Sequence, residues 1–259
     1  MCNGVKSLWT ILSCFVVIQA YADTKTWTGG AGNALFSSAS NWNPAGAPAS
    51  GDALVFANSS ALNVTNDLVG YSFSGITVSG SAAVTFQSGG NGFTLTGDIA
   101  ITGSRELNLA VPVTLNSAVT LNVTNASFYA YSPITGTGGI TVIGGKDFYA
   151  KDAVALTNGV TVNRGRLIVE KTTFTAPVTL NQLSVGGSSY VSMTFQNSGT
   201  YKIPITLANS DGNNSALYAP GGAYVTNTAP VTLAPSAYTR WRPDGSITHA
   251  GGIIVQTPA

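Results

Sequence analysis

Residues 176–180 read Ala-Pro-Val-Thr-Leu, and close copies of this motif recur along the chain. Four copies share an apolar residue, a proline, a β-branched residue, a threonine and a leucine, and their prolines are Pro112, Pro177, Pro204 and Pro230. Residues 132–135 (Ser-Pro-Ile-Thr) are a shorter copy around Pro133. The intervals between successive prolines are similar, except that the interval from Pro133 to Pro177 is about twice as long as the one before it. Such a regular period predicts a repeat architecture in which similar units stack on one another.

Short alternating segments lie between the prolines. Segments such as 139–142 (Gly-Ile-Thr-Val) and 159–162 (Gly-Val-Thr-Val) alternate polar and apolar residues, which indicates half-buried strands. About three such segments fit in one period, and no stretch after residue 22 has a helical pattern. The sequence therefore predicts an all-β fold, a single-stranded parallel β-helix (a solenoid). We expect the prolines to begin strands at the same corner of each coil, where no amide hydrogen is needed.

An antiparallel β-sandwich is the alternative fold. Its hairpins favour two-residue Asn-Gly turns, and these are scarce here. The pairs 91–92 and 158–159 are Asn-Gly, but each precedes a strand-like segment. The pattern favours the solenoid.

The composition excludes several classes of protein. Only 8% of the residues are charged, whereas about 25% is usual, and 44% are hydrophobic. Disordered chains are poor in apolar residues, and exposed helices need many charged residues. There are 11 basic and 10 acidic residues, so the basic excess needed for a nucleic-acid partner is absent. What remains is a β-rich chain whose solvated faces carry Thr, Ser and Asn.

Residues 1–22 have the organisation of an export signal. A positive start at Lys6 and an apolar stretch precede the small-x-small sequence Ala20-Tyr21-Ala22, which places the mature start at Asp23. The alternatives are a buried helix, a membrane anchor, or a lipoprotein signal ending at Cys14. Cleavage removes both cysteines and leaves ten basic and ten acidic residues. No later apolar run is long enough for a transmembrane segment.

The mature chain divides into three parts. We expect an N-terminal cap and first coil over residues 23–60, β-helix coils of about 20–27 residues over 61–233, and an irregular C-terminal cap or truncated continuation over 234–259. A solenoid leaves its end coils open, so an apolar cap is needed. Trp27 and Trp42 are large enough to close the N-terminal end.

Residues 134–169 resemble the autotransporter-associated β-strand repeat. The opening Ile-Thr-Gly-Thr-Gly-Gly-Ile-Thr (134–141) and the close Gly-Val-Thr-Val-Asn-Arg-Gly-Arg-Leu-Ile-Val (159–169) match the family pattern, while residues 146–150 depart from it. The stretch 27–56 is similar to the N-terminal part of exported proteins of this family. The resemblance implies a right-handed β-helix passenger, secreted or on the cell surface of a Gram-negative-type bacterium, here without the C-terminal barrel.

The sequence offers little catalytic chemistry. His249 is the only histidine, so a histidine-based metal cluster is excluded. Residues 89–94 approach a calcium-binding nonapeptide, but Thr94 stands where the required Asp would be. The acidic residues are thinly spread. We therefore expect no catalytic residue, no cofactor and no metal site.

A low-charge chain makes its few charged and aromatic clusters stand out. Tyr129 and Tyr131 share a strand face, and Phe148-Tyr149 follows about one coil later, so these aromatics either form an outer ladder or pack in and around the core. Arg164 and Arg166 alternate with a single residue between them and would share a strand face. The candidate binding strip combines these with a neighbouring charged pair: Tyr129, Tyr131, Lys146, Asp147, Arg164 and Arg166.

Two functions from different classes follow. The first is an exported, non-enzymatic rod with a structural or adhesive role, whose partner is a glycan or a protein surface. The second is a polysaccharide lyase or hydrolase on the same scaffold, which needs three or more carboxylates converging in one groove.

Overall fold

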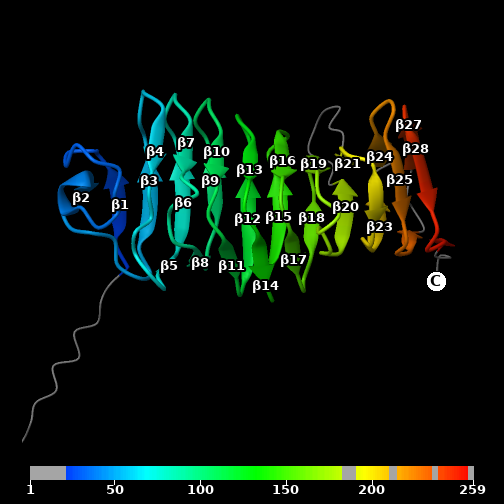
Figure 1. Ribbon diagram of the computed structural model, residues 1–259, viewed down its shortest axis with the longest axis horizontal. Coiled ribbons are helices and arrows are strands. Elements are labelled where there is room, and N and C mark those ends of the chain that lie inside the picture. The colour runs from blue at the N-terminus through cyan, green and yellow to red at the C-terminus, as the bar shows by residue number, and fades with distance from the viewer. Residues whose placement is uncertain (1–21, 183–190, 210–214, 235–238, 256–259) are drawn as a thin grey trace, which may run out of the picture.

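The computed structural model describes residues 22–182, 191–209, 215–234 and 239–255, and these form a β-solenoid of about 8 turns (Figure 1). The described residues contain 29 strands and one short 3-10 helix, η1 (Ala39–Asn41). Every strand pair is parallel except β1 with β2. The expectation of an all-β parallel solenoid is confirmed.

The strands line three faces, and from β3 to β18 every third strand returns to the same sheet. The first face is a 12-stranded sheet of β2 (Trp42–Asn43), β1 (Thr24–Trp27), β3 (Ala53–Phe56), β6 (Gly75–Val78), β9 (Ile99–Ile101), β12 (Ala118–Asn122), β15 (Gly139–Ile143), β18 (Val160–Val162), β20 (Val178–Gln182), β23 (Ile205–Asn209), β26 (Val231–Leu233) and β29 (Ile253–Val255). The second face is a 9-stranded sheet of β4 (Leu62–Val64), β7 (Val84–Phe86), β10 (Leu107–Leu109), β13 (Phe128–Ala130), β16 (Asp147–Ala150), β19 (Gly165–Val169), β21 (Val191–Phe195), β24 (Ser215–Ala219) and β27 (Thr239–Pro243).

Two shorter sheets share the third face of the solenoid. One has five strands: β5 (Ser72–Phe73), β8 (Phe93–Leu95), β11 (Val113–Leu115), β14 (Ile134–Gly136) and β17 (Val154–Leu156). The other has three strands: β22 (Gly199–Tyr201), β25 (Tyr224–Asn227) and β28 (Ser246–His249).

Alternation along most strands separates the core from the surface, whereas all five residues of β21 are buried. In β13, Phe128 and Ala130 are buried while Tyr129 between them is only half-buried. Phe128 packs against Phe148 of the next coil, with ring centroids 5.4 Å apart. Because each coil is too thin to bury its apolar residues alone, stacking with its neighbours completes the core.

A row of threonines runs along the outer face of the 12-stranded sheet. Six consecutive strands place a threonine in register, and these are Thr120, Thr141, Thr161, Thr179, Thr206 and Thr232. Each threonine lies one coil after the previous one, and the coils differ in length without breaking the row. All six are half-buried. This face is therefore polar without being charged, which explains how a chain with so few charged residues can present a solvated surface.

The repeat prolines mark two corners rather than the single corner expected. Pro112 and Pro133 precede β11 and β14 on the third face, whereas Pro177, Pro204 and Pro230 precede strands of the 12-stranded sheet. Each proline carbonyl still accepts a hydrogen bond from a neighbouring coil, such as that from Val178 N at 2.8 Å to Pro204. Any strand start tolerates a missing amide hydrogen, so the motif alone did not distinguish the faces.

Aromatic rings fill the N-terminal end of the solenoid. β1 pairs with β3 on one side and with β2 on the other. The N-terminal aromatic cluster comprises Trp27, Phe36, Trp42 and Phe56. The Trp42 ring centroid lies 4.9 Å from that of Trp27 and 5.1 Å from that of Phe36, both edge to face.

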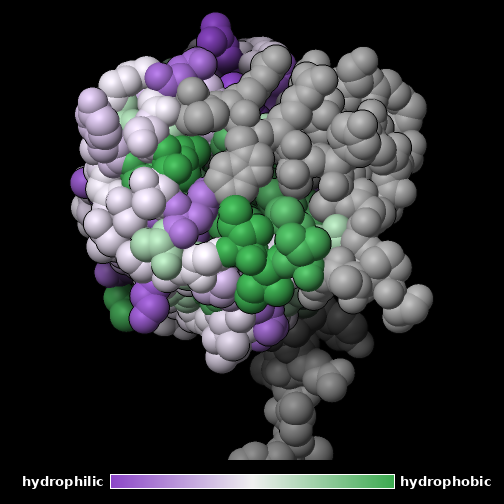
Figure 2. Space-filling model, turned by 90° about the vertical axis from the view of Figure 1, so that its right-hand side faces the viewer, coloured by the Kyte–Doolittle hydropathy of each residue, from purple (hydrophilic) through white to green (hydrophobic). Residues whose placement is uncertain are grey.

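Residues 239–255 contain three strands, although the segment 234–259 was expected to be irregular; residues 235–238 and 256–259 lie outside the described residues. Strands β27, β28 and β29 continue all three faces by pairing with β24, β25 and β26. Ile253, Ile254 and Val255 of β29 are exposed, and Figure 2, which views this end, shows apolar side chains gathered on it. The sequence 239–243 (Thr-Arg-Trp-Arg-Pro) does not alternate clearly between polar and apolar residues, so the sequence alone did not predict a strand there. In the structure this segment is a strand because it pairs in register with β24.

Candidate functional site

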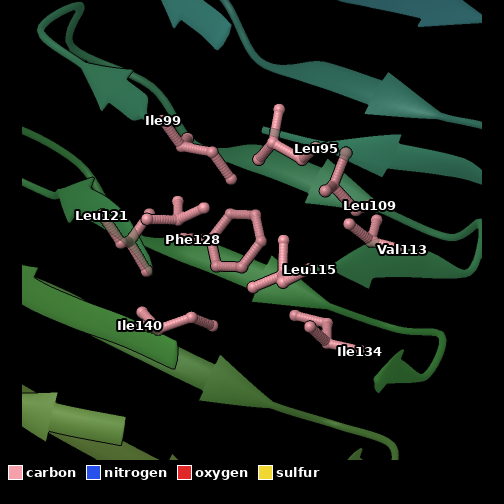
Figure 3. Close-up of a pocket in the computed structure, with 10 residues that line it drawn as sticks. Leu95, Ile99, Leu109, Val113, Leu115, Leu121, Phe128, Ile134 and Ile140 are labelled. Carbon is pink, nitrogen blue, oxygen red and sulfur yellow. The ribbon is translucent and has the colours of Figure 1, made fainter. Parts of the chain in front are cut away.

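An enclosed space inside the solenoid is too small and too apolar to be a ligand site. Its volume is about 10 Å³. Figure 3 shows the side chains that converge on it: Leu95, Ile99, Leu109, Val113, Leu115, Val119, Leu121, Phe128, Ile134 and Ile140. A space of one water's size without polar partners stays dry. This space therefore offers no site for a ligand.

Three tyrosines form a ladder on the outer face of the 9-stranded sheet. Register places Tyr129 of β13 directly beside Tyr149 of β16. Their rings stack with centroids 4.4 Å apart and an interplanar angle of 7°. Tyr131, just after β13, lies 6.1 Å from Tyr129 at 17° and is 47% exposed. Tyr131 is therefore the ring of the ladder that is open to solvent.

Two ion pairs flank the tyrosine ladder. Arg166 donates two hydrogen bonds to Asp147, from Nε to Oδ1 at 2.8 Å and from Nη2 to Oδ2 at 2.7 Å. The Tyr149 hydroxyl donates to the same Oδ2 at 3.3 Å. On the other side, Lys151 Nζ lies 2.6 Å from Glu170 Oε1. Two-pronged Arg–carboxylate pairs hold their geometry well, so Asp147 is a fixed acceptor and not a free base.

Lys151 also sits among the three rings. Its Nζ lies 5.5 Å from the ring centroid of Tyr131, 5.7 Å from that of Tyr149 and 5.9 Å from that of Tyr129. A cation at this distance is attracted to the ring face by about 0.5–1 kcal/mol at exposed sites. Lys151 and Glu170 were not among the predicted site residues. Their separation in the sequence is close to one coil, and this is the signal that could have revealed the pair.

The environment of the ladder raises the pKa values of two of its tyrosines and of the neighbouring Arg166. Desolvation and the charge of Asp147 raise the pKa of Tyr149 to about 12. Desolvation and the charge of Glu106 raise the pKa of Tyr129, and the hydrogen bonds to Asp147 raise the pKa of Arg166. The neutral phenols and the charged guanidinium are therefore the forms present near neutral pH.

The remaining residues of the predicted strip lie at its edge. Lys146 and Arg164 are exposed and occupy the turns that precede β16 and β19. Arg164 thus precedes the strand that carries Arg166. The two arginines do not share a strand face, contrary to what their spacing in the sequence had suggested. The side chain of Arg164 lies beside Gly145, since a Cβ built there would be 3.3 Å from Arg164 Nε. The strip is consequently two turns and a ladder rather than one flat face.

Several of the carboxylates lie apart from one another and bind partners in their own surroundings. Asp98 accepts from Thr120 N at 2.6 Å, Asp152 accepts from Ala153 N at 2.7 Å, and Glu170 pairs with Lys151. In the described part of the chain, no group of three or more His, Cys, Asp or Glu residues is placed to hold a metal ion. His249 lies on β28, where burial lowers its pKa.

The expected signal-cleavage site lies next to residues that are hydrogen-bonded to the solenoid. Ala20 lies outside the described residues, while Ala22 and Asp23 are described. Asp23 N donates to the buried Asp52 Oδ1 at 2.8 Å, and Asp23 O accepts from Ala53 N at 2.8 Å. The residue where the mature chain is expected to begin is therefore hydrogen-bonded to the next coil.

Replacing Tyr149 with phenylalanine is expected to remove a phenol that titrates near pH 12. Because the folded-state pKa is raised, the phenol stabilises the fold fully below pH 10, and this contribution is lost as the pH rises towards 12. Ultraviolet difference titration of both proteins measures this. A Tyr149 that titrates near pH 10 would show that the ladder does not desolvate it.

Among the described residues, no helix is long and apolar enough to cross a membrane. Comparison with known proteins finds no matching family model, no matching curated protein and no matching solved structure.

Proposed function

We propose that the chain is an exported, non-enzymatic solenoid that serves as a structural or adhesive rod at the cell surface or outside the cell, and that it attaches to glycans through the tyrosine ladder. Export and location are supported by the signal-like residues 1–22 and by the resemblance to autotransporter-associated β-strand repeats. The proposal extends the solenoid architecture to a biological role.

The tyrosine ladder is the observation that carries the adhesive role. Sugar rings pack their apolar faces on aromatic rings, and Tyr131 presents such a ring at 47% exposure. The stack with Tyr129 and the nearby Lys151 hold it in place, so little conformational entropy is lost on binding. The charged neighbours supply hydrogen-bonding groups around the ring.

The alternative, a polysaccharide lyase or hydrolase, depends on free carboxylates. Asp147 and Glu170 are each held by a basic side chain. A general acid or base must instead reach the substrate proton. Incubating the purified protein with neutral and acidic polysaccharides and measuring newly formed reducing ends tests this directly. Turnover would replace the adhesive proposal with an enzymatic one.

Replacing Tyr131 with alanine is expected to weaken glycan binding about two- to tenfold, since an aromatic contact contributes about 0.5–1.5 kcal/mol. Tyr131 is chosen because its removal leaves the closer Tyr129–Tyr149 stack intact. Tyr224, which is 74% exposed on β25, provides the matched control when replaced with alanine.

A glycan array identifies ligands of the wild-type protein, and titration calorimetry then compares the two variants. Equal weakening by both tyrosine variants would mean that the ladder is not the binding site. Failure of the wild-type protein to bind any glycan would contradict the adhesive proposal itself.

A further inference from the structure

Basic residues concentrate in the part of the chain that forms the ladder. Residues 105–171 contain six of the ten basic residues of the mature chain and only four of its acidic residues. The six basic residues are Arg105, Lys146, Lys151, Arg164, Arg166 and Lys171. In a chain that is otherwise nearly uncharged, this excess is a local feature with an electrostatic effect on any ligand.

Local ion pairs leave part of this charge uncompensated. Arg166 is bound by Asp147 and Lys151 by Glu170. Lys146 and Arg164 form no ion pair with any residue that the structure describes. Asp147 follows Lys146 directly, but both of its oxygens already accept hydrogen bonds from Arg166. The two exposed cations are therefore available to an external anion.

The backbone brings these two cations together on adjacent coils. β16 and β19 pair in register, with Asp147 opposite Arg166, so the turns before them are neighbours. Arg166 N donates to Lys146 O at 3.4 Å, which ties the two turns. Gly145 has φ +101° and no side chain, and the arm of the Arg164 side chain passes beside it. A side chain at position 145 would fill this space.

The cations and the exposed tyrosine lie at opposite ends of neighbouring strands of the 9-stranded sheet. Lys146 precedes β16, whereas Tyr131 follows β13 and is level with Lys151, whose amide donates to Ala130 O at 2.9 Å. The extended chain from Lys146 to Lys151 corresponds to about 16 Å. A ligand that touches both must be an oligosaccharide lying along the strands, because a single sugar is too short.

We propose that the ladder and its two free cations bind an anionic polysaccharide, with a sugar ring on Tyr131 and a carboxylate or sulfate group at Lys146 and Arg164. This deepens the proposed function and rests on it. Arginine offers paired donors that match the geometry of both anionic groups, and lysine adds a compact point charge. Asp147 and Arg166, on the strands that follow these two turns, form an ion pair with each other.

Matched polysaccharides test the charge requirement. Polygalacturonate carries carboxylates, and its fully methyl-esterified form has the same backbone without charge; dextran sulfate and dextran form the corresponding sulfate pair. The purified protein is expected to bind the anionic member of at least one pair and to bind it less tightly as salt increases. The carboxylate and sulfate arms distinguish the two sources of anion.

The double variant Lys146→Gln/Arg164→Gln is expected to weaken anionic binding about tenfold or more, because two charge-assisted contacts are lost. Lys202→Gln removes an exposed cation elsewhere and is expected to leave binding unchanged. Both variants are expected to melt like the wild-type protein, since the replaced side chains are exposed.

Three outcomes would overturn the anionic inference. These are equal binding to the neutral polysaccharides, equal binding to a single-stranded DNA oligonucleotide, and unchanged binding by the double variant. Equal binding to neutral glycans would leave the adhesive proposal standing. Binding to no glycan would remove both proposals.

Discussion

Replacing Trp42 with alanine is expected to lower the free energy of unfolding by about 3–5 kcal/mol, the range for removing a large buried aromatic side chain. Trp42 is 2% exposed and packs edge to face against Trp27 and Phe36. Its Nε1–H donates to Phe36 O at 2.9 Å, so the substitution also leaves a buried carbonyl unsatisfied. Urea denaturation followed by fluorescence and circular dichroism measures the loss.

The location of this destabilisation tests whether the N-terminal aromatic cluster acts as a cap. Each solenoid coil contacts only its neighbours, so hydrogen exchange is expected to accelerate first in β1 and β3 and last in β20. Trp42→Phe keeps a ring and is expected to lose a smaller part of the stability. Uniform acceleration along the whole solenoid, or a loss below about 1 kcal/mol, would contradict the capping role that the sequence suggested for Trp27 and Trp42.

Gly136→Ala is expected to lower the free energy of unfolding by about 3 kcal/mol or more, from backbone strain and overpacking together. Gly136 ends β14 with φ +131°, a conformation that side chains rarely adopt. A Cβ there would lie 2.1 Å from Leu115 O. That carbonyl also accepts from Gly138 N at 2.8 Å, so relief of the clash would break a bond between coils.

Gly89→Ala is the matched control for Gly136. Gly89 has no positive φ, and a Cβ there meets nothing within 4 Å. Its replacement is expected to change the melting temperature little, or to raise it slightly because the unfolded chain loses freedom. Similar melting temperatures for the two variants would mean that the coils adjust freely to a side chain at position 136.

The tyrosine ladder shows which contacts the strand alternation and the repeat period can predict. Alternation along one strand placed Tyr129 and Tyr131 together, and the period of the repeat placed Tyr149 one coil away. Both proposed arrangements of these aromatics occur: the tyrosines form an outer ladder and Phe128 and Phe148 pack in the core. The one-coil spacing of Lys151 and Glu170 is a signal that could have indicated their ion pair, but the exact partners depend on the local register, in which Asp147 lies opposite Arg166.

The sequence by itself determined the parallel solenoid, the inward apolar residues and the uncharged outer rows, because a two-residue alternation repeated at a near-constant period permits few other structures. Only the tertiary structure decided that the repeat prolines divide between two corners and that residues 239–255 form strands. It also decided that Asp147 and Glu170 neutralise Arg166 and Lys151 while Lys146 and Arg164 stay unpaired among the described residues. The physical reason is register: neighbours across coils are set by hydrogen bonding between strands one coil apart, and that alignment is not written in any local stretch of the sequence.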